Sequence, residues 1–222
     1  MDYRKKRIDS LAGFVIDAYS TVMNNFYRVN FQNTERFGHC ADRGFVLLPK
    51  HQSNLDILLE GMLLRKIGRY GNYVMKDSLP KLFEYVGGIG ITRVKDLRKQ
   101  PGYHNREMRS EMLAAAKGRR EEVEEELLNL LKMNEIIVVH VEGKRYYQTK
   151  TKINRANLQR FLGIQKKLGE QITFFPLDIK YQDMGQFRSE VLLKVGNPAK
   201  VKDDGLEDLT NHLAKEIELL EA

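Results

Sequence analysis

Residues 46–56 read Val-Leu-Leu-Pro-Lys-His-Gln-Ser-Asn-Leu-Asp. The apolar run at their start predicts a buried strand that Pro49 ends, and the apolar residues after Asp56 predict a helix. His51 and Asp56 would therefore lie on a strand-to-helix turn. On one regular helix, five steps of about 100° would set the two side chains roughly 140° apart. In a turn, the Asp56 carboxylate can instead reach the imidazole of His51 and fix its tautomer, which leaves the other ring nitrogen as a base for a substrate hydroxyl.

Ser53 and Asp56 also fit a purely structural interpretation. A serine followed three residues later by an acidic residue is a common helix cap, in which the hydroxyl accepts hydrogen bonds from the first-turn amides. The carboxylate then interacts favourably with the helix dipole. These two residues alone leave capping and catalysis open, and the rest of the chain has to decide between them.

The remaining sequence alternates predicted strands and helices. Helical periodicity marks residues 106–131, 155–168 and 206–220, and the continuous β-branched run at 136–141 is typical of a buried parallel strand. Further strands are expected at residues 72–75, 86–94, 172–181 and 191–195. Pro176 indicates an edge strand or a bulge, because proline cannot donate to a sheet ladder. We therefore expect an α/β fold with a mostly parallel central sheet flanked by helices.

The N-terminal region carries apolar residues at every third or fourth position over residues 8–29, which predicts an amphipathic helix. This helix either packs on the sheet or lies in a membrane interface, where the basic residues before it would face anionic lipid. We expect residues 1–32 to form this N-terminal part and residues 33–222 to form the main domain. The sequence has no uncharged apolar run long enough for a transmembrane helix and no signal-peptide cleavage site.

The chain of 222 residues has 37 Lys and Arg against 30 Asp and Glu, a net charge of +7. This surplus indicates an anionic partner such as lipid headgroups, nucleotide phosphates or an acidic carrier protein. We expect no nucleic-acid partner, because no basic stretch is interleaved with aromatic residues and no recognition helix is evident. The single cysteine, Cys40, excludes an internal disulfide.

Candidate functional residues follow three of the predicted strands. His51 and Asp56 follow the first, Arg93 follows another, and Glu142 and Arg145 follow a third. In open parallel sheets, ligands bind beyond the carboxyl ends of the strands. Two arginines beside a His–Asp pair suit a phosphate-bearing substrate that is held while one of its hydroxyls is deprotonated.

These segments also resemble, in order, the four signature blocks of the glycerolipid acyltransferases. His-Gln-Ser-Asn-Leu-Asp at residues 51–56 resembles the first block, and residues 76–93, which end in Gly-Ile-Thr-Arg, are similar to the second. Val-Glu-Gly-Lys-Arg at residues 141–145 resembles the third block, and Phe-Pro-Leu at residues 175–177 the fourth. Four blocks in the right order are far more specific than any one of them.

The resemblance implies acyl transfer from acyl-CoA or acyl-carrier protein to a glycerol phosphate or lysophospholipid, above all 1-acylglycerol 3-phosphate, in phospholipid synthesis. It implies His51 as general base, Asp56 as its orienting partner and no further cofactor. The substrate-binding residues that it implies are Arg93, Glu142, Gly143, Arg145 and Lys76. Residues 33–222 would be the acyltransferase domain of a peripheral protein on anionic lipid at the cytoplasmic face of a membrane.

The chain departs from the family pattern at three positions. Lys50 stands where the family usually has asparagine, and Val141 and Lys144 replace the usual proline and threonine of the third block. These departures bear on the identity of the acceptor.

Two alternatives stay open. The first is a metal-dependent hydrolase that uses His51, Asp56, His140 and Glu142, although their spacing matches no recognised metal motif. The second is a catalytically silent family member that binds lipid, against which the presence of both His51 and Asp56 argues.

Overall fold

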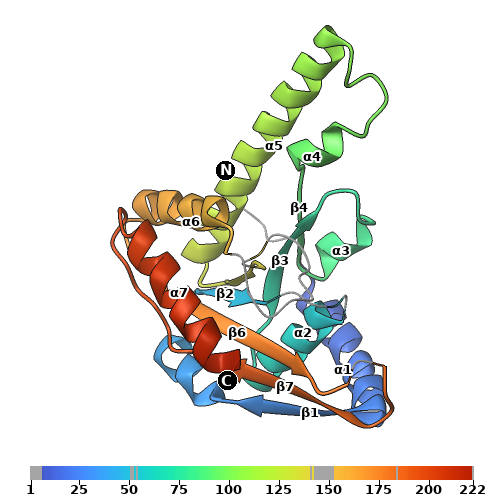
Figure 1. Cartoon of the computed structure of the whole chain (residues 1–222), viewed down its shortest axis with the longest axis vertical. Helices are drawn as coiled ribbons and strands as arrows, with labels where there is room; N and C mark the ends of the chain where they lie inside the picture. Colours follow the sequence, from blue (N-terminus) through green and yellow to red (C-terminus); the bar gives the residue numbers. More distant parts are fainter. Residues whose placement is uncertain are drawn as a thin grey trace.

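The structure is a computed structural model that describes residues 7–50, 53, 55–140, 142, 153–183 and 185–221. Within these residues the chain forms a seven-stranded sheet with helices on both faces (Figure 1). The strands are β1 (Tyr27–Gln32), β2 (Val46–Pro49), β3 (Gly71–Lys76), β4 (Gly88–Ile91), β5 (Ile136–Val138), β6 (Phe174–Tyr181) and β7 (Ser189–Val195). The helices are α1 (Asp9–Phe26), η1 (Thr34–Cys40), α2 (Asp56–Lys66), α3 (Leu82–Tyr85), α4 (Val94–Leu97), α5 (Arg106–Lys132), α6 (Arg155–Leu168) and α7 (Leu206–Glu221).

The strand order is β1-β7-β6-β2-β5-β3-β4. Strands β6, β2, β5, β3 and β4 are mutually parallel, whereas β7 runs antiparallel to β6 and β1 runs parallel to β7. The prediction of a mostly parallel α/β sheet flanked by helices, with an N-terminal helix, is confirmed. Because the five parallel strands end on one side, the residues that follow them share the carboxyl edge of the sheet.

The two faces of the sheet carry separate cores, as the alternation of side chains along a strand requires. On β2, Val46 and Leu48 pack with residues of α5, α6 and α7, while Leu47 packs with residues of α1 and α2. All three side chains are fully buried. The continuous apolar strand is thus explained by helices on both faces.

The expected N-terminal helix is shorter than predicted. Helix α1 ends at Phe26, and residues Tyr27–Gln32 form β1, in which Val29 pairs with Val191 of β7. Val29 fits both patterns, because it continues the helical stripe and also one face of a strand with alternating burial. The backbone pairing with β7 determines that residues 27–32 form a strand and do not continue the helix.

The expectation of an edge strand at Pro176 is wrong, because β6 lies between β7 and β2. Pro176 pairs in regular register with Leu48 of β2, and its carbonyl accepts a hydrogen bond from the Gly196 amide at 2.8 Å. Leu177 pairs with Val195 of β7, and Phe174 forms an antiparallel bridge with Ala199, so the partner segment has one extra residue opposite Pro176. The alternative expectation of a bulge therefore fits, and a proline is tolerated where the regular ladder is interrupted in this way.

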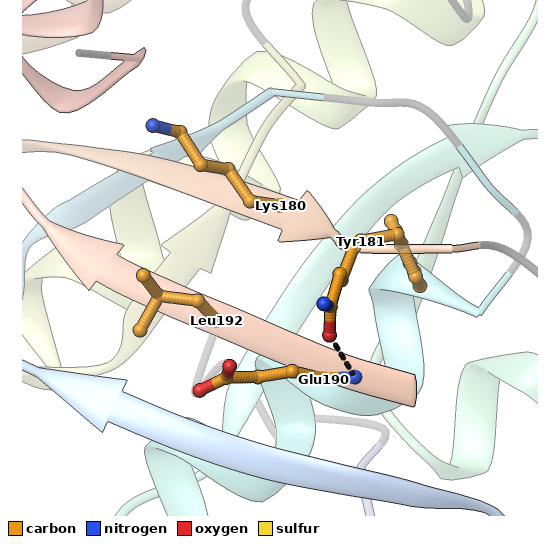
Figure 2. A pocket seen from close by; sticks show the side chains of 5 residues that line it. Lys180, Tyr181, Glu190 and Leu192 are labelled. Atoms are coloured by element: carbon orange, nitrogen blue, oxygen red, sulfur yellow. Dashed lines mark hydrogen bonds between the residues drawn. The ribbon is translucent and has the colours of Figure 1, made fainter. Parts of the chain in front are cut away.

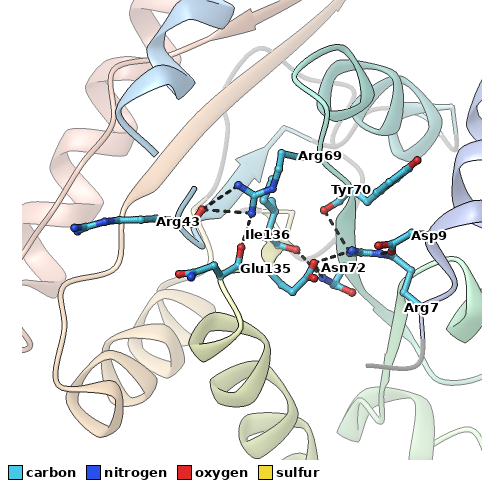
Figure 3. A network of polar contacts seen from close by, with 9 residues as sticks. Arg7, Asp9, Arg43, Arg69, Tyr70, Asn72, Glu135 and Ile136 are labelled. Carbon is cyan, nitrogen blue, oxygen red and sulfur yellow. Dashed lines mark hydrogen bonds and ion pairs between the residues drawn. The ribbon is translucent and has the colours of Figure 1, made fainter. Parts of the chain in front are cut away.

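A polar network fastens the start of α1 to the amino edge of the sheet (Figure 3). The buried guanidinium of Arg7 donates to Asp9 Oδ1 and to Glu135 Oε2, each at 2.7 Å, and to the Tyr70 carbonyl at 3.4 Å. Glu135 directly precedes β5, and Tyr70 directly precedes β3. The network holds the start of α1 at the amino edge of the sheet. The described candidate functional residues lie at the opposite, carboxyl edge.

Candidate active site at the carboxyl edge of the sheet

Asp56 is the first residue of α2 and is fully buried. Its Oδ2 accepts a hydrogen bond from the Ser53 amide at 2.7 Å, and its Oδ1 accepts one from the Tyr181 hydroxyl at 2.6 Å. Tyr181 is the last residue of β6, the strand beside β2. The carboxylate is therefore oriented from two sides, by its own turn and by the neighbouring strand end.

The capping interpretation of Ser53 and Asp56 holds in part. The Ser53 hydroxyl accepts a hydrogen bond from the Leu55 amide at 3.2 Å, and Asp56 accepts one from the Ser53 amide. These bonds stabilise the turn before α2. They do not account for the hydrogen bond that Asp56 accepts from Tyr181 at the end of the neighbouring strand. A helix cap does not require a hydrogen bond from a buried phenol, whereas a carboxylate that must keep a fixed orientation does.

Tyr181 packs on the face of the sheet that carries α1 and α2. Its neighbours Lys180 and Gln182, with Glu190 and Leu192 of β7, line a cavity of about 390 Å³ on the opposite face (Figure 2), because side chains alternate along a strand. Burial raises the pKa of the Tyr181 hydroxyl well above its usual value, and the negative charge and hydrogen bond of Asp56 raise it further. The phenol therefore keeps its proton and remains a hydrogen-bond donor to Asp56.

A second buried acid lies one helical turn beyond Asp56. Glu60 is fully buried, and its Oε1 lies 3.0 Å from Nε2 of His140, which follows β5. Burial alone would lower the pKa of His140, but the charge and hydrogen bond of Glu60 and the charges of Asp56 and Glu142 outweigh it, so the pKa is raised. His140 is thus held as a partner of Glu60 among several carboxylates.

Lys76 and Arg93 lie at the same edge of the sheet. Lys76 ends β3 and pairs with Ile91, and Arg93 lies two residues further along the chain. Nε of Arg93 donates to Asp96 Oδ2 at 2.6 Å. This hydrogen bond, with smaller contributions from nearby lysines, lowers the pKa of Asp96 against the opposing effect of partial burial. The edge therefore carries a cationic group on each of two neighbouring strands.

The third block is described only in part. Glu142 is buried, with 5% of its surface exposed. His51, Gly143 and Arg145 lie outside the described residues. The roles expected for these three residues therefore stay predictions.

The lateral distance between Asp56 and Arg93 follows from the strand order. Asp56 follows β2 and Arg93 follows β4, with β5 and β3 between them. Three strand spacings amount to about 14 Å.

The metal alternative gains no support from the described part of the chain. Among those residues, no group of three or more His, Cys, Asp or Glu side chains is arranged to hold a metal ion. The four-residue set proposed from the sequence includes His51, which lies outside the described residues.

Tyr181 and Glu60 were missed by the sequence analysis. Glu60 carried a signal, because an acidic residue inside the apolar run Ile-Leu-Leu-Glu-Gly-Met-Leu-Leu is costly to bury without a partner. Tyr181 carried none beyond its place at a strand end, since its partner lies 125 residues away.

Comparisons with known proteins bear on the family and the fold of the chain. A family model described as Acyltransferase matches residues 28–180, which is more than half of the chain. A solved structure of the 1-acyl-sn-glycerophosphate (LPA) acyltransferase PlsC from Thermotoga maritima is similar, with a TM-score of 0.54 and 18% sequence identity. The match covers 96% of this chain and 83% of that one. No curated protein sequence matches the chain.

Proposed function

The chain belongs to the acyltransferase family, and from this premise we propose that it moves a fatty acyl group from a thioester to a hydroxyl of a glycerol phosphate or lysophospholipid. The proposed acceptor is 1-acylglycerol 3-phosphate, and the proposed donor is acyl-CoA or acyl-carrier protein. The observation that carries the proposal is the buried Asp56, which two hydrogen bonds hold at the start of α2, five residues after His51 in the sequence.

In the proposed mechanism, His51 takes the proton of the acceptor hydroxyl while the oxygen attacks the thioester carbonyl. The tetrahedral intermediate collapses by breaking the carbon–sulfur bond, and the imidazolium returns the proton to the leaving thiolate. Asp56 stabilises the imidazolium, and Tyr181 and the Ser53 amide keep the carboxylate in position. General-base catalysis of this kind contributes about 10² to 10⁴ in rate.

The acceptor phosphate is proposed to lie at the carboxyl ends of β3 and β4. Lys76 and Arg93 supply positive charge there, and Arg93 can form paired hydrogen bonds to phosphate oxygens. Glu142, Gly143 and Arg145 are proposed to complete the substrate site, as the resemblance of the third block implies. No cofactor is required for this chemistry.

The outer surface of α1 supports a proposal of membrane binding. Phe14, Val22 and Phe26 are 71%, 51% and 53% exposed, and Phe187 packs edge-on against Phe26 with ring centroids 5.9 Å apart. Exposed aromatic and aliphatic side chains on one helix suit a membrane interface. We propose that this surface lies on anionic lipid at the cytoplasmic face of a membrane, as a peripheral contact.

In the described part of the chain, no helix has both the length and the apolar character needed to span a bilayer.

The test is an acyltransferase assay on the purified protein. Acyl-CoA and acyl-carrier protein are each supplied with glycerol 3-phosphate and a panel of lysophospholipids, and product is measured for the wild type, His51→Ala and His39→Ala. His39 is an exposed histidine of η1 and serves as the matched control. We expect His51→Ala to lose about 10²-fold or more in kcat while His39→Ala keeps full activity.

Two results would contradict the proposal. Equal product from the wild type and His51→Ala would remove His51 from the mechanism. No product with any donor and acceptor would refute the proposed reaction itself.

A further inference from the structure

A second cavity lies on the side of the sheet edge away from Asp56. It has a volume of about 380 Å³ and is formed by residues 91–95 at the end of β4, by Arg120 of α5 and by the first turns of α6. We call it the β4–α6 cleft. Its cationic side chains are Arg93, Lys95, Arg120 and Arg160, and none of the described residues that line it is acidic.

Two carboxylates contact these cations and neutralise them only in part. Asp96 accepts a hydrogen bond from Arg93, and Glu124 lies 3.6 Å from Arg160. Four cationic groups against these two carboxylates leave a surplus of two positive charges in the cleft. A phosphate monoester carries a charge of about −1.5 to −2 at neutral pH and would balance this surplus.

Arg120 of α5 and Arg160 of α6 both line the cleft, and their like charges repel one another. Arg160 is half-buried, with 20% of its side chain exposed. Burial is the main cause that lowers its pKa; Glu124 opposes the shift, and the like charge of Arg120 adds to it. Arg120 makes no hydrogen bond or ion pair to any other described residue. An anion between the two guanidinium groups would relieve their repulsion.

The start of α6 adds to the same field. Asn154 caps this 14-residue helix by accepting hydrogen bonds from the Ala156 and Asn157 amides, and the first turn contains no acidic residue. The side chains of Asn154 and Asn157 both line the cleft. The positive end of the helix dipole therefore points to a cleft that already has surplus positive charge.

We propose that the β4–α6 cleft binds a phosphate group of one of the two substrates, with Arg120 and Arg160 as anchors beyond Arg93. The inference rests on the proposed acyl transfer, because that reaction supplies two phosphate sources. One is the glycerol phosphate of the acceptor, and the other is the set of phosphates on the CoA donor. Neither Arg120 nor Arg160 belongs to the four sequence blocks.

The experiment measures binding without turnover, by isothermal titration of the full chain at low salt with CoA and, separately, with glycerol 3-phosphate. The variants are Arg120→Gln and Arg160→Gln, and Arg109→Gln on the exposed part of α5 is the matched control. We expect each cleft variant to weaken the binding of one probe by about tenfold or more, as the loss of a charged hydrogen bond predicts. The control should bind both probes as tightly as the wild type.

The probe that is weakened identifies the source of the phosphate: CoA indicates the donor, and glycerol 3-phosphate the acceptor. Unchanged binding of both probes to Arg120→Gln and Arg160→Gln would overturn the inference, as would a wild type that binds neither probe. Because Arg120 is exposed, its substitution cannot act through a folding defect. If the protein binds a probe in the cleft but has no acyltransferase activity, the proposed reaction is refuted and the proposed phosphate site remains supported.

Discussion

The hydrogen bond from Tyr181 to Asp56 gives the sharpest test of the site. Tyr181→Phe removes one hydroxyl and leaves the ring in place, so a fully buried carboxylate oxygen loses its 2.6 Å donor. A hydrogen bond to a charged group is worth about 1.5–3 kcal/mol. If that energy orients Asp56 in the transition state, kcat should fall about 10- to 100-fold, at about 1.4 kcal/mol for each factor of ten. KM should change little, because Tyr181 is proposed to act through Asp56.

The assay follows thiol release from acyl-CoA with the acceptor identified in the substrate panel. Because the pKa of Tyr181 is raised, the wild-type phenol stays protonated, and the ratio of the two kcat values should be constant from about pH 6 to 9. Tyr103→Phe, in the segment between α4 and α5, is the control. Urea unfolding checks that both variants are folded, since the unpaired Asp56 oxygen itself costs about 1–3 kcal/mol of stability.

The reasoning is refuted if folded Tyr181→Phe keeps kcat within about twofold of the wild type. A rise in KM at constant kcat would also refute it, because that pattern belongs to a residue that binds substrate in the ground state.

Three further predictions concern stability and membrane binding. The folded-state pKa of His140 is raised, so its pairing with Glu60 stabilises the fold fully below about pH 6.5 and this contribution is lost as pH rises through the folded pKa. Glu60→Gln should flatten the dependence of the unfolding free energy on pH above that value, and an unchanged pH profile would contradict the pairing. Leu127→Ala, in the core under α5, should lower the unfolding free energy by about 2–5 kcal/mol in urea titrations, and a loss below 1 kcal/mol would show that the site is not tightly packed. Phe14→Asp should reduce co-sedimentation with anionic vesicles severalfold, whereas equal sedimentation would exclude α1 as the membrane contact.

Local patterns predicted much of the fold because they depend on residues close in sequence. Helix α6 begins and ends where its periodicity predicts, with Asn154 and Gly169 as the flanking caps. Strands β2 and β5 were recognisable as continuous apolar runs, because helices cover both of their faces. The errors arose where one residue satisfied two patterns, as Val29 did, or where the position in the sheet decides the cost, as for Pro176.

The sequence by itself predicted most of the helix and strand segments, the position of Asp56 at the start of a helix that follows a strand, and the cationic residues Lys76 and Arg93 at later strand ends. Only the tertiary structure decided which of these groups meet. Tyr181 reaches Asp56 because β6 lies beside β2, and Glu60 contacts His140 because α2 packs against the strand that delivers the histidine. Strand order and register are set by packing between segments far apart in the chain, and no local preference encodes them. The oriented carboxylate and the β4–α6 cleft are therefore properties of the assembled sheet.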